Sequence, residues 1–123
     1  MLFMRKILLI DDCKEIGASI KCGINSYYFD QAETVTQALS LLEKPHIYDL
    51  LLIDVGLPDG NGFDLCAKLT GDPKHDRTPK ILLTGNSQVS EKVYGFSCGA
   101  DDYITKPFNM IELKARIDRY FAK

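Results

Sequence analysis

Three carboxylates directly follow two short apolar runs in this chain, and their placement predicts chemistry at one edge of a sheet. Asp11 and Asp12 follow residues 7–10, and Asp54 follows residues 50–53. Short apolar runs with abrupt polar ends are typical of buried strands in a parallel sheet. If the two strands are neighbours, the three acids lie close together and repel one another. Such a cluster is typical of a site for a hard divalent cation, beside which a carboxylate can act as a nucleophile.

Length and composition exclude several classes of protein. The 123 residues, 46% of them hydrophobic, suit one domain with a modest core. A formal net charge of −2 provides no basic field for nucleic acid, so we expect DNA binding only through an additional C-terminal domain. The first residues lack the order of a signal peptide, and no segment has the length to cross a bilayer. The sequence therefore predicts a soluble, cytoplasmic protein that does not contact a membrane.

Strand-like runs alternate with stretches of helical periodicity along the chain. The strands are predicted at residues 5–10, 26–30, 49–53, 80–84 and 101–104. This alternation predicts an α/β fold with a parallel sheet and helices on both of its faces. We expect the flavodoxin-like, doubly wound, five-stranded sheet with strand order 2-1-3-4-5, in which the first and third strands are adjacent. The three acids would then share one crevice.

Two further polar residues are expected at the same sheet edge. The fourth predicted strand ends at Thr84, and the fifth ends close to Lys106. A nucleophile candidate, two further acids, a hydroxyl and an ammonium together suit a phosphoryl group and Mg²⁺. Asp54 could attack phosphorus in line to give an aspartyl phosphate, with which Lys106 would pair and to which the Thr84 hydroxyl would donate. Hydrogen bonds to a charged group are worth about 1.5–3 kcal/mol, enough to bias a two-state element. The residues therefore predict a switch rather than turnover chemistry.

Four motifs give the chain a resemblance to the receiver domain of two-component response regulators over essentially its whole length. The motifs are KILLIDD at residues 6–12, LLIDVGLPDGNG at 51–62, ILLTG at 81–85 and GADDYITKPF at 99–108. The resemblance implies that residues 1–123 form one receiver (phosphoacceptor) domain. It also implies that the chain is no enzyme in the ordinary sense, since it would catalyse only its own phosphorylation and dephosphorylation.

The resemblance assigns a role to each residue of the cluster. It makes Asp54 the phosphorylation site, Asp12 a direct ligand of Mg²⁺ (or of Mn²⁺ in its place) and Asp11 a ligand through water, with the backbone carbonyl of Gly56 completing the protein's share. It makes Lys106, before a cis Pro107, the partner of the phosphate. Thr84 and Tyr103 become a coupled switch pair, with a half-buried strand aromatic that does not move as the alternative for Tyr103.

Partners follow from the same resemblance. A sensor histidine kinase or a phosphotransfer protein would face Ile16 and Ser19 of the first helix. Residues 112–117 resemble the last helix of the OmpR/PhoB subfamily, whose members dimerise through charges on the fourth helix, fifth strand and fifth helix. On this face the chain carries Lys92, Asp101, Asp102, Glu112 and Arg116. Lys92 with Glu112 and Asp102 with Arg116 are the pairs expected between subunits, and a solvated face of mixed charges is the alternative.

Three other functions can be weighed against the residues. A haloacid-dehalogenase-type phosphatase needs a second Asp two positions after its nucleophile, and Gly56 stands there. A flavodoxin wraps the FMN phosphate with a loop rich in hydroxyls and glycine, which residues 11–14 (DDCK) would instead repel. A phosphorylation-independent pseudo-receiver, acting as a protein-interaction module, stays as the alternative, although such proteins typically lose one of the acids or the lysine.

The other reactive side chains have ordinary interpretations. The four cysteines form no C-x-x-C pair and are expected to be reduced core thiols, with Cys13 on the rim of the acid cluster. His46 and His75 lie in predicted loops, where we expect both to be solvated.

Several glycines stand where they should affect the site. Gly17 and Gly23 each weaken the first helix by about 1 kcal/mol relative to Ala, so we expect this helix to be short or mobile. Gly56 and Asn86 flank the site at positions where the resemblance implies that side chains tune hydrolysis of the acyl phosphate.

Overall fold

A five-stranded parallel sheet forms the centre of the molecule. The computed structural model describes residues 4–44, 47–85 and 89–122. The strands of this sheet lie in the order β2-β1-β3-β6-β7, and each neighbouring pair is parallel. Their bounds are Lys6–Ile10 for β1, Tyr28–Ala32 for β2, Leu50–Asp54 for β3, Lys80–Thr84 for β6 and Asp102–Thr105 for β7. The predicted flavodoxin-like order 2-1-3-4-5 is therefore confirmed.

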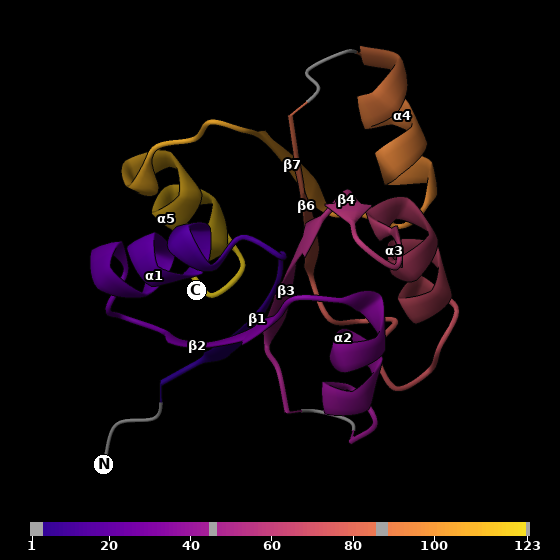
Figure 1. The fold of residues 1–123 in the computed structure, drawn as a ribbon, viewed down its shortest axis with the longest axis horizontal. Helices are drawn as coiled ribbons and strands as arrows, with labels where there is room; N and C mark the ends of the chain where they lie inside the picture. Colours follow the sequence, from indigo (N-terminus) through magenta and orange to yellow (C-terminus); the bar gives the residue numbers. More distant parts are fainter. Residues whose placement is uncertain (1–3, 45–46, 86–88, 123) are drawn as a thin grey trace.

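Helices cover both faces of the sheet (Figure 1). They are α1 at Lys14–Gly23, α2 at Val35–Leu41, α3 at Gly62–Thr70, α4 at Val89–Ser97 and α5 at Met110–Arg119. Helices α1 and α5 lie on one face, and α2, α3 and α4 lie on the other. The pleat divides each strand between two cores: Ile7 and Leu9 pack with α1 and α5, whereas Leu8 and Ile10 pack with α2 and α3. Burial on both faces explains why the strands are continuous apolar runs.

Most strands begin or end within one residue of the prediction, but the second strand is shifted by two residues, and one short pair of strands was not predicted. Strand β2 begins at Tyr28 rather than residue 26, because Tyr28 pairs with Lys6 and donates its N–H to the carbonyl of Arg5. Tyr27 instead turns toward the C-terminal segment, where its ring lies 5.4 Å from that of Phe121. The turn after β3 also contains a short antiparallel pair, β4 (Gly56–Leu57) and β5 (Gly60–Asn61), which the turn residues alone did not indicate.

The first helix is not short, so that part of the expectation was wrong. Helix α1 runs for ten residues, with Gly17 buried within it and Gly23 at its end. Its amphipathic face buries Ile20 against the sheet, and this tertiary packing outweighs the low helix propensity of the glycines.

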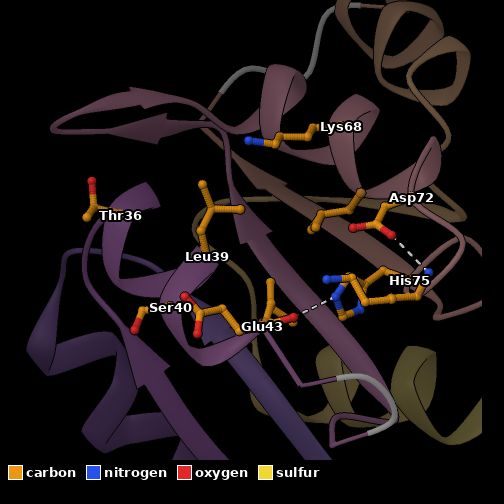
Figure 2. A pocket seen from close by; sticks show the side chains of 10 residues that line it. Thr36, Leu39, Ser40, Glu43, Lys68, Asp72 and His75 are labelled. Carbon is orange, nitrogen blue, oxygen red and sulfur yellow. Dashed lines mark hydrogen bonds between the residues drawn. The ribbon is translucent and has the colours of Figure 1, made fainter.

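His75 is buried, contrary to the expectation of a solvated loop residue. Its ring Nε2 lies 2.8 Å from the carbonyl oxygen of Leu42, beside the groove between α2 and α3 that Figure 2 shows. The ammonium of Lys80, itself buried, donates to the carbonyls of His75 and Thr78. Both side chains are inside because carbonyls at the end of α2 and in the loop before β6 need donors. His46 lies outside the described residues.

The cysteines are free thiols, and they meet the expectation of core positions in part. Cys66 is buried, and its burial raises the pKa of the thiol to about 11, which makes it unreactive. Cys13 and Cys98 are partly buried, whereas Cys22 is exposed on α1.

No helix among the described residues is long and apolar enough to cross a membrane.

A close approach of backbone to backbone joins β3 to α3. A Cβ added at Gly62 would lie 2.2 Å from the carbonyl oxygen of Asp54, and the Gly62 N–H donates to the carbonyl of Val55. The Asn61 side chain caps the helix here by accepting from the N–H of Phe63. Glycine is required at residue 62 because any side chain would push α3 away from the end of β3.

We therefore expect Gly62→Ala to lower the free energy of unfolding by about 1–3 kcal/mol, the usual range for overpacking. Urea unfolding followed by circular dichroism would measure this. Gly71→Ala is the matched control, because its Cβ would lie 3.7 Å from the nearest atom, an ordinary contact. The control should change stability by less than about 0.5 kcal/mol. Equal effects of the two substitutions would contradict the account of Gly62.

Candidate functional site

The carboxyl ends of β1 and β3 bring the three predicted acids together. Each of Asp11, Asp12 and Asp54 offers one oxygen to a group whose atoms all lie within 4.8 Å of one another. Asp11 and Asp54 are buried, and Asp12 is exposed at the rim. Three carboxylates at this spacing form an oxygen-rich group that could hold a metal ion.

Asp11 is the most firmly held of the three. Its N–H donates to the carbonyl of Ala32 at the end of β2, and its Oδ1 accepts from the N–H of Cys13. Its Oδ2 accepts from the ammonium of Lys106 at 2.8 Å. Both carboxylate oxygens therefore have donors, as a fully buried charge requires.

Lys106 follows the edge strand β7, and its side chain extends to the acids at the ends of β1 and β3. Its Nζ lies 2.8 Å from Asp11 and 3.4 Å from Asp54, and the Lys106–Pro107 peptide bond is cis, as the resemblance implied. Burial works against the ammonium, but the hydrogen bond and charge of Asp11, together with Asp54, raise the pKa of Lys106 above its ordinary value. The lysine therefore stays charged between the two carboxylates.

Asp54 has an unfavourable environment for its own charge. Burial and the neighbouring charge of Asp11 raise its pKa, while Lys106 and the N–H of Gly56 act in the opposite direction without cancelling the shift. One ammonium does not neutralise three carboxylates, so a divalent cation would relieve the remaining repulsion.

Two glycines near the ends of β3 and β6 have open space where a side chain would stand. A Cβ added at Gly56 or at Gly85 would meet nothing within 4 Å. Gly56 lies two residues after Asp54, in β4, and Gly85 directly follows Thr84. Asn86, expected to flank the site, lies outside the described residues.

Thr84 and Tyr103 share a partner that the sequence did not indicate. The Thr84 hydroxyl donates to Oε1 of Glu91 at 3.1 Å, and the Tyr103 hydroxyl donates to the same oxygen at 3.3 Å. The Tyr103 ring is buried, and the ammonium of Lys92 lies 5.8 Å from its centre. Glu91 therefore joins α4 to the ends of β6 and β7. As one acid among several on a helix surface, it carried no distinguishing signal.

The charges expected at a dimer face are partly paired within this chain. Arg116 contacts Asp102 at 2.7 Å and Glu112 at 3.5 Å, all in one molecule. Asp101 accepts from the N–H of Lys80 and so closes the turn into β7. The same region exposes apolar side chains, namely Val93, Tyr94 and Phe96 of α4 and Ile111 of α5. The pairing of Asp102 with Arg116 between subunits stays a prediction.

Comparison with known proteins gives one consistent result. Residues 7–118 match the family described as the response regulator receiver domain. Among curated relatives, the transcriptional regulatory protein CpxR of Klebsiella pneumoniae is 41% identical over 116 residues, and the DNA-binding regulator RpaA of Synechocystis is 36% identical over 118. Both alignments cover 93% of this chain but 48% of the relative, so the chain spans about half the length of these proteins.

Solved structures resemble the chain over nearly its full length. The BeF3-activated receiver domain of DrrB, a Thermotoga maritima OmpR/PhoB homolog, superposes with a TM-score of 0.88 at 32% identity and covers 98% of this chain and 100% of its own. The chemotaxis response regulator CheY4 of Vibrio cholerae gives 0.88 at 26% identity, with 96% and 99% covered.

The contacts of Lys106 lead to a test by substitution. Lys106→Met should destabilise the protein without added metal by about 3 kcal/mol, because it leaves the buried Asp11 carboxylate without its cation. Added Mg²⁺ should raise the melting temperature of the variant more than that of the wild type, since no ammonium then competes for the same oxygens. Thermal melts in EDTA and in Mg²⁺ would measure both effects.

Lys114→Met is the matched control, because Lys114 pairs with Asp118 at 2.8 Å on an exposed helix surface. It should cost less than about 1 kcal/mol and leave the response to Mg²⁺ unchanged. If Lys106→Met melted like this control, the Lys106 ion pairs would not hold the site.

Proposed function

The chain belongs to the response regulator receiver domain family of two-component systems, and we propose that it accepts a phosphoryl group on Asp54 in a Mg²⁺-dependent reaction. A sensor histidine kinase or a phosphotransfer protein would be the donor. The observation that carries the proposal is the cluster of Asp11, Asp12 and Asp54 with the Lys106 ammonium 2.8 Å and 3.4 Å from two of them. The pseudo-receiver alternative is not favoured, because the acids and the lysine are all present and assembled.

The proposed reaction is an in-line transfer from a phosphohistidine. An Asp54 carboxylate oxygen attacks phosphorus, the new O–P bond forms as the P–N bond breaks, and the imidazole leaves with the bonding pair and takes a proton from solvent. Asp11 and Asp12, with the carbonyl of Gly56, would hold Mg²⁺, which supplies positive charge to the phosphoryl oxygens. Lys106 already lies beside Asp54 and needs to move little to contact a phosphoryl oxygen.

Thr84 and Lys106 would also transmit the effect of phosphorylation at Asp54 to the rest of the fold. In the unphosphorylated protein the Thr84 hydroxyl donates to Glu91. A phosphoryl group on Asp54 offers charged oxygens that compete for this donor. Transfer of the Thr84 hydrogen bond would loosen the contact of β6 with α4, while the Tyr103 hydroxyl could still donate to Glu91. The output would be a change of the face made by α4, β7 and α5.

Output partners follow from the relatives only as proposals. CpxR and RpaA carry names that describe transcriptional regulation, and this chain matches about half of each. We place any DNA binding in a further C-terminal domain, and homodimerisation on the face with Lys92, Asp101, Asp102, Glu112 and Arg116. Exposed Val93, Phe96 and Ile111 would add apolar area to that interface. Kinase docking is assigned to α1, where Ile16 and Ser19 line a groove with Phe108.

Phosphorylation itself can be tested by mass. Incubation of wild-type protein with acetyl phosphate and Mg²⁺ should add one phosphoryl group by intact mass spectrometry, and Asp54→Asn should abolish the adduct. EDTA should suppress it in the wild type. An adduct that persists in Asp54→Asn would place the nucleophile elsewhere, and no adduct in the wild type would support the pseudo-receiver.

Glu91 provides a second test of the same proposal. Glu91→Gln keeps the shape but replaces a charged acceptor by a neutral one, which weakens its hold on the Thr84 hydroxyl by about 1 kcal/mol. The rate of adduct formation should therefore rise about fivefold, measured by mass over time in acetyl phosphate and Mg²⁺. Glu43→Gln, at an exposed position after α2, is the control with unchanged rate. Equal rates in the two variants would show that Glu91 does not restrain Thr84.

A further inference from the structure

Gln31 contacts the loop that carries Asp11 and Asp12, although it belongs to a different strand. It lies on β2 at the edge of the sheet, next to β1. Its side-chain nitrogen Nε2 donates to the carbonyl oxygen of Asp11 at 2.9 Å and to that of Cys13 at 3.0 Å. These two carbonyls stand on either side of Asp12 in the chain, so one amide group spans the backbone of the exposed acid.

The backbone of the same loop has few other restraints. The Asp11 N–H donates to Ala32, and the Cys13 N–H donates to the Asp11 side chain. The carbonyl of Cys13 also accepts the first helical bond, from the N–H of Gly17 at 3.3 Å. Cys13 caps α1 without a side-chain hydrogen bond. Among the described residues, the two hydrogen bonds from Gln31 are therefore the side-chain contacts by which a residue outside the loop holds the loop's carbonyls.

Gly17 makes room for this amide. A Cβ added at Gly17 would lie 1.9 Å from Oε1 of Gln31 and 2.6 Å from its Cδ. The clash would be with the end of a flexible side chain, so the amide would move and the helix would stay. A glycine in the middle of α1, which the sequence alone presents only as a weakness, thus has a specific partner on β2.

We infer that Gln31, seated against Gly17, is a positioning residue that fixes the loop of residues 11–13 for cation binding. The inference rests on the proposed function. Mg²⁺ requires near-octahedral geometry with short oxygen distances, so a ligand loop that moves by a fraction of an ångström loses affinity. Asp12 is exposed, and packing does not fix its side chain. Fixing its backbone from both sides is the remaining way to set where its carboxylate lies.

The opposing interpretation is that Gln31 only satisfies two partly buried carbonyls and so supports the fold alone. The two interpretations differ in what they predict for metal affinity. A fold-only role lowers the melting temperature in EDTA and leaves the Mg²⁺ dissociation constant of the folded protein unchanged. A positioning role raises that constant, as loss of an outer contact behind a metal ligand typically does by 10–100-fold.

Gln31→Met removes the donor at similar size and should raise the Mg²⁺ dissociation constant about tenfold by isothermal titration calorimetry at 25 °C. Gly17→Ala should raise it as well, even though alanine favours the helix, because the new methyl displaces the amide. In the double variant Gln31→Ala with Gly17→Ala, the alanine at residue 17 should add nothing to the effect of Gln31→Ala alone. Such non-additivity is expected only if the two residues act through one contact.

Two controls match these changes in type. Gln37→Met removes a glutamine on α2 whose Oε1 accepts from the N–H of Glu33, away from the acids. Gly23→Ala adds a methyl near Met110 at the other end of α1. Both should leave the Mg²⁺ dissociation constant within twofold of wild type.

The outcomes separate this inference from the proposed function. If wild type binds Mg²⁺ and both Gln31→Met and Gly17→Ala bind it equally well, Gln31 is a structural residue and the inference is overturned while the proposed function stands. If wild type itself fails to bind Mg²⁺, both are overturned. Should Gln31→Met fail to fold, Gly17→Ala decides alone, and wild-type affinity in that variant would sink the inference.

Discussion

The ion pair between the Lys106 ammonium and the buried Asp11 carboxylate is the interaction on which the rest of the site depends. Asp11 follows β1, and Lys106 follows β7, with β3 and β6 between them in the sheet. The lysine stem therefore crosses the sheet edge and passes Asp54 on the way, which accounts for the distances of 2.8 Å and 3.4 Å. A buried carboxylate without such a partner costs several kcal/mol. The pair thus places one positive charge beside two buried acids before any cation arrives.

Two glycines allow close contacts that set the positions of the acids in this cluster. Gly62 lets the start of α3 lie against the carbonyl of Asp54, and Gly17 lets the Gln31 amide lie against α1 and reach the loop around Asp12. In each case the glycine is not the residue that acts. Instead, the absence of a side chain lets a neighbouring group set the position of an acid. At Gly62 this happens through backbone packing, and at Gly17 it happens through the hydrogen bonds of Gln31. Both glycines lie in helices, where propensity alone would disfavour them.

The features that could be predicted from the sequence are those set by local pattern. Apolar runs followed by Asp11, Asp12, Asp54 and Thr84 predicted the strands. Their alternation with helices predicted the strand order, and with it that the acids lie close together. Partners that depend on three-dimensional packing could not be found in this way. His75 and Lys80 are inside because particular loop carbonyls need donors, and nothing in their spacing says which carbonyls those are. Glu91 acquires its role only when α4 lies over β6 and β7, and Asp102 pairs with Arg116 in its own chain because of how α5 packs.

Thr84 connects the acid cluster to the face that would carry output. Its carbonyl accepts from the N–H of Lys106 at 2.6 Å, while its hydroxyl donates to Glu91 on α4. One residue is therefore tied through its backbone to the lysine of the site and through its side chain to a helix. In the proposed switch, moving a hydrogen bond of about 1.4 kcal/mol from Glu91 to a phosphoryl oxygen would change the ratio of two arrangements of α4 about tenfold. Since Tyr103 donates to the same oxygen of Glu91, the switch need not break both contacts, and a shift of this size requires no rearrangement of the sheet.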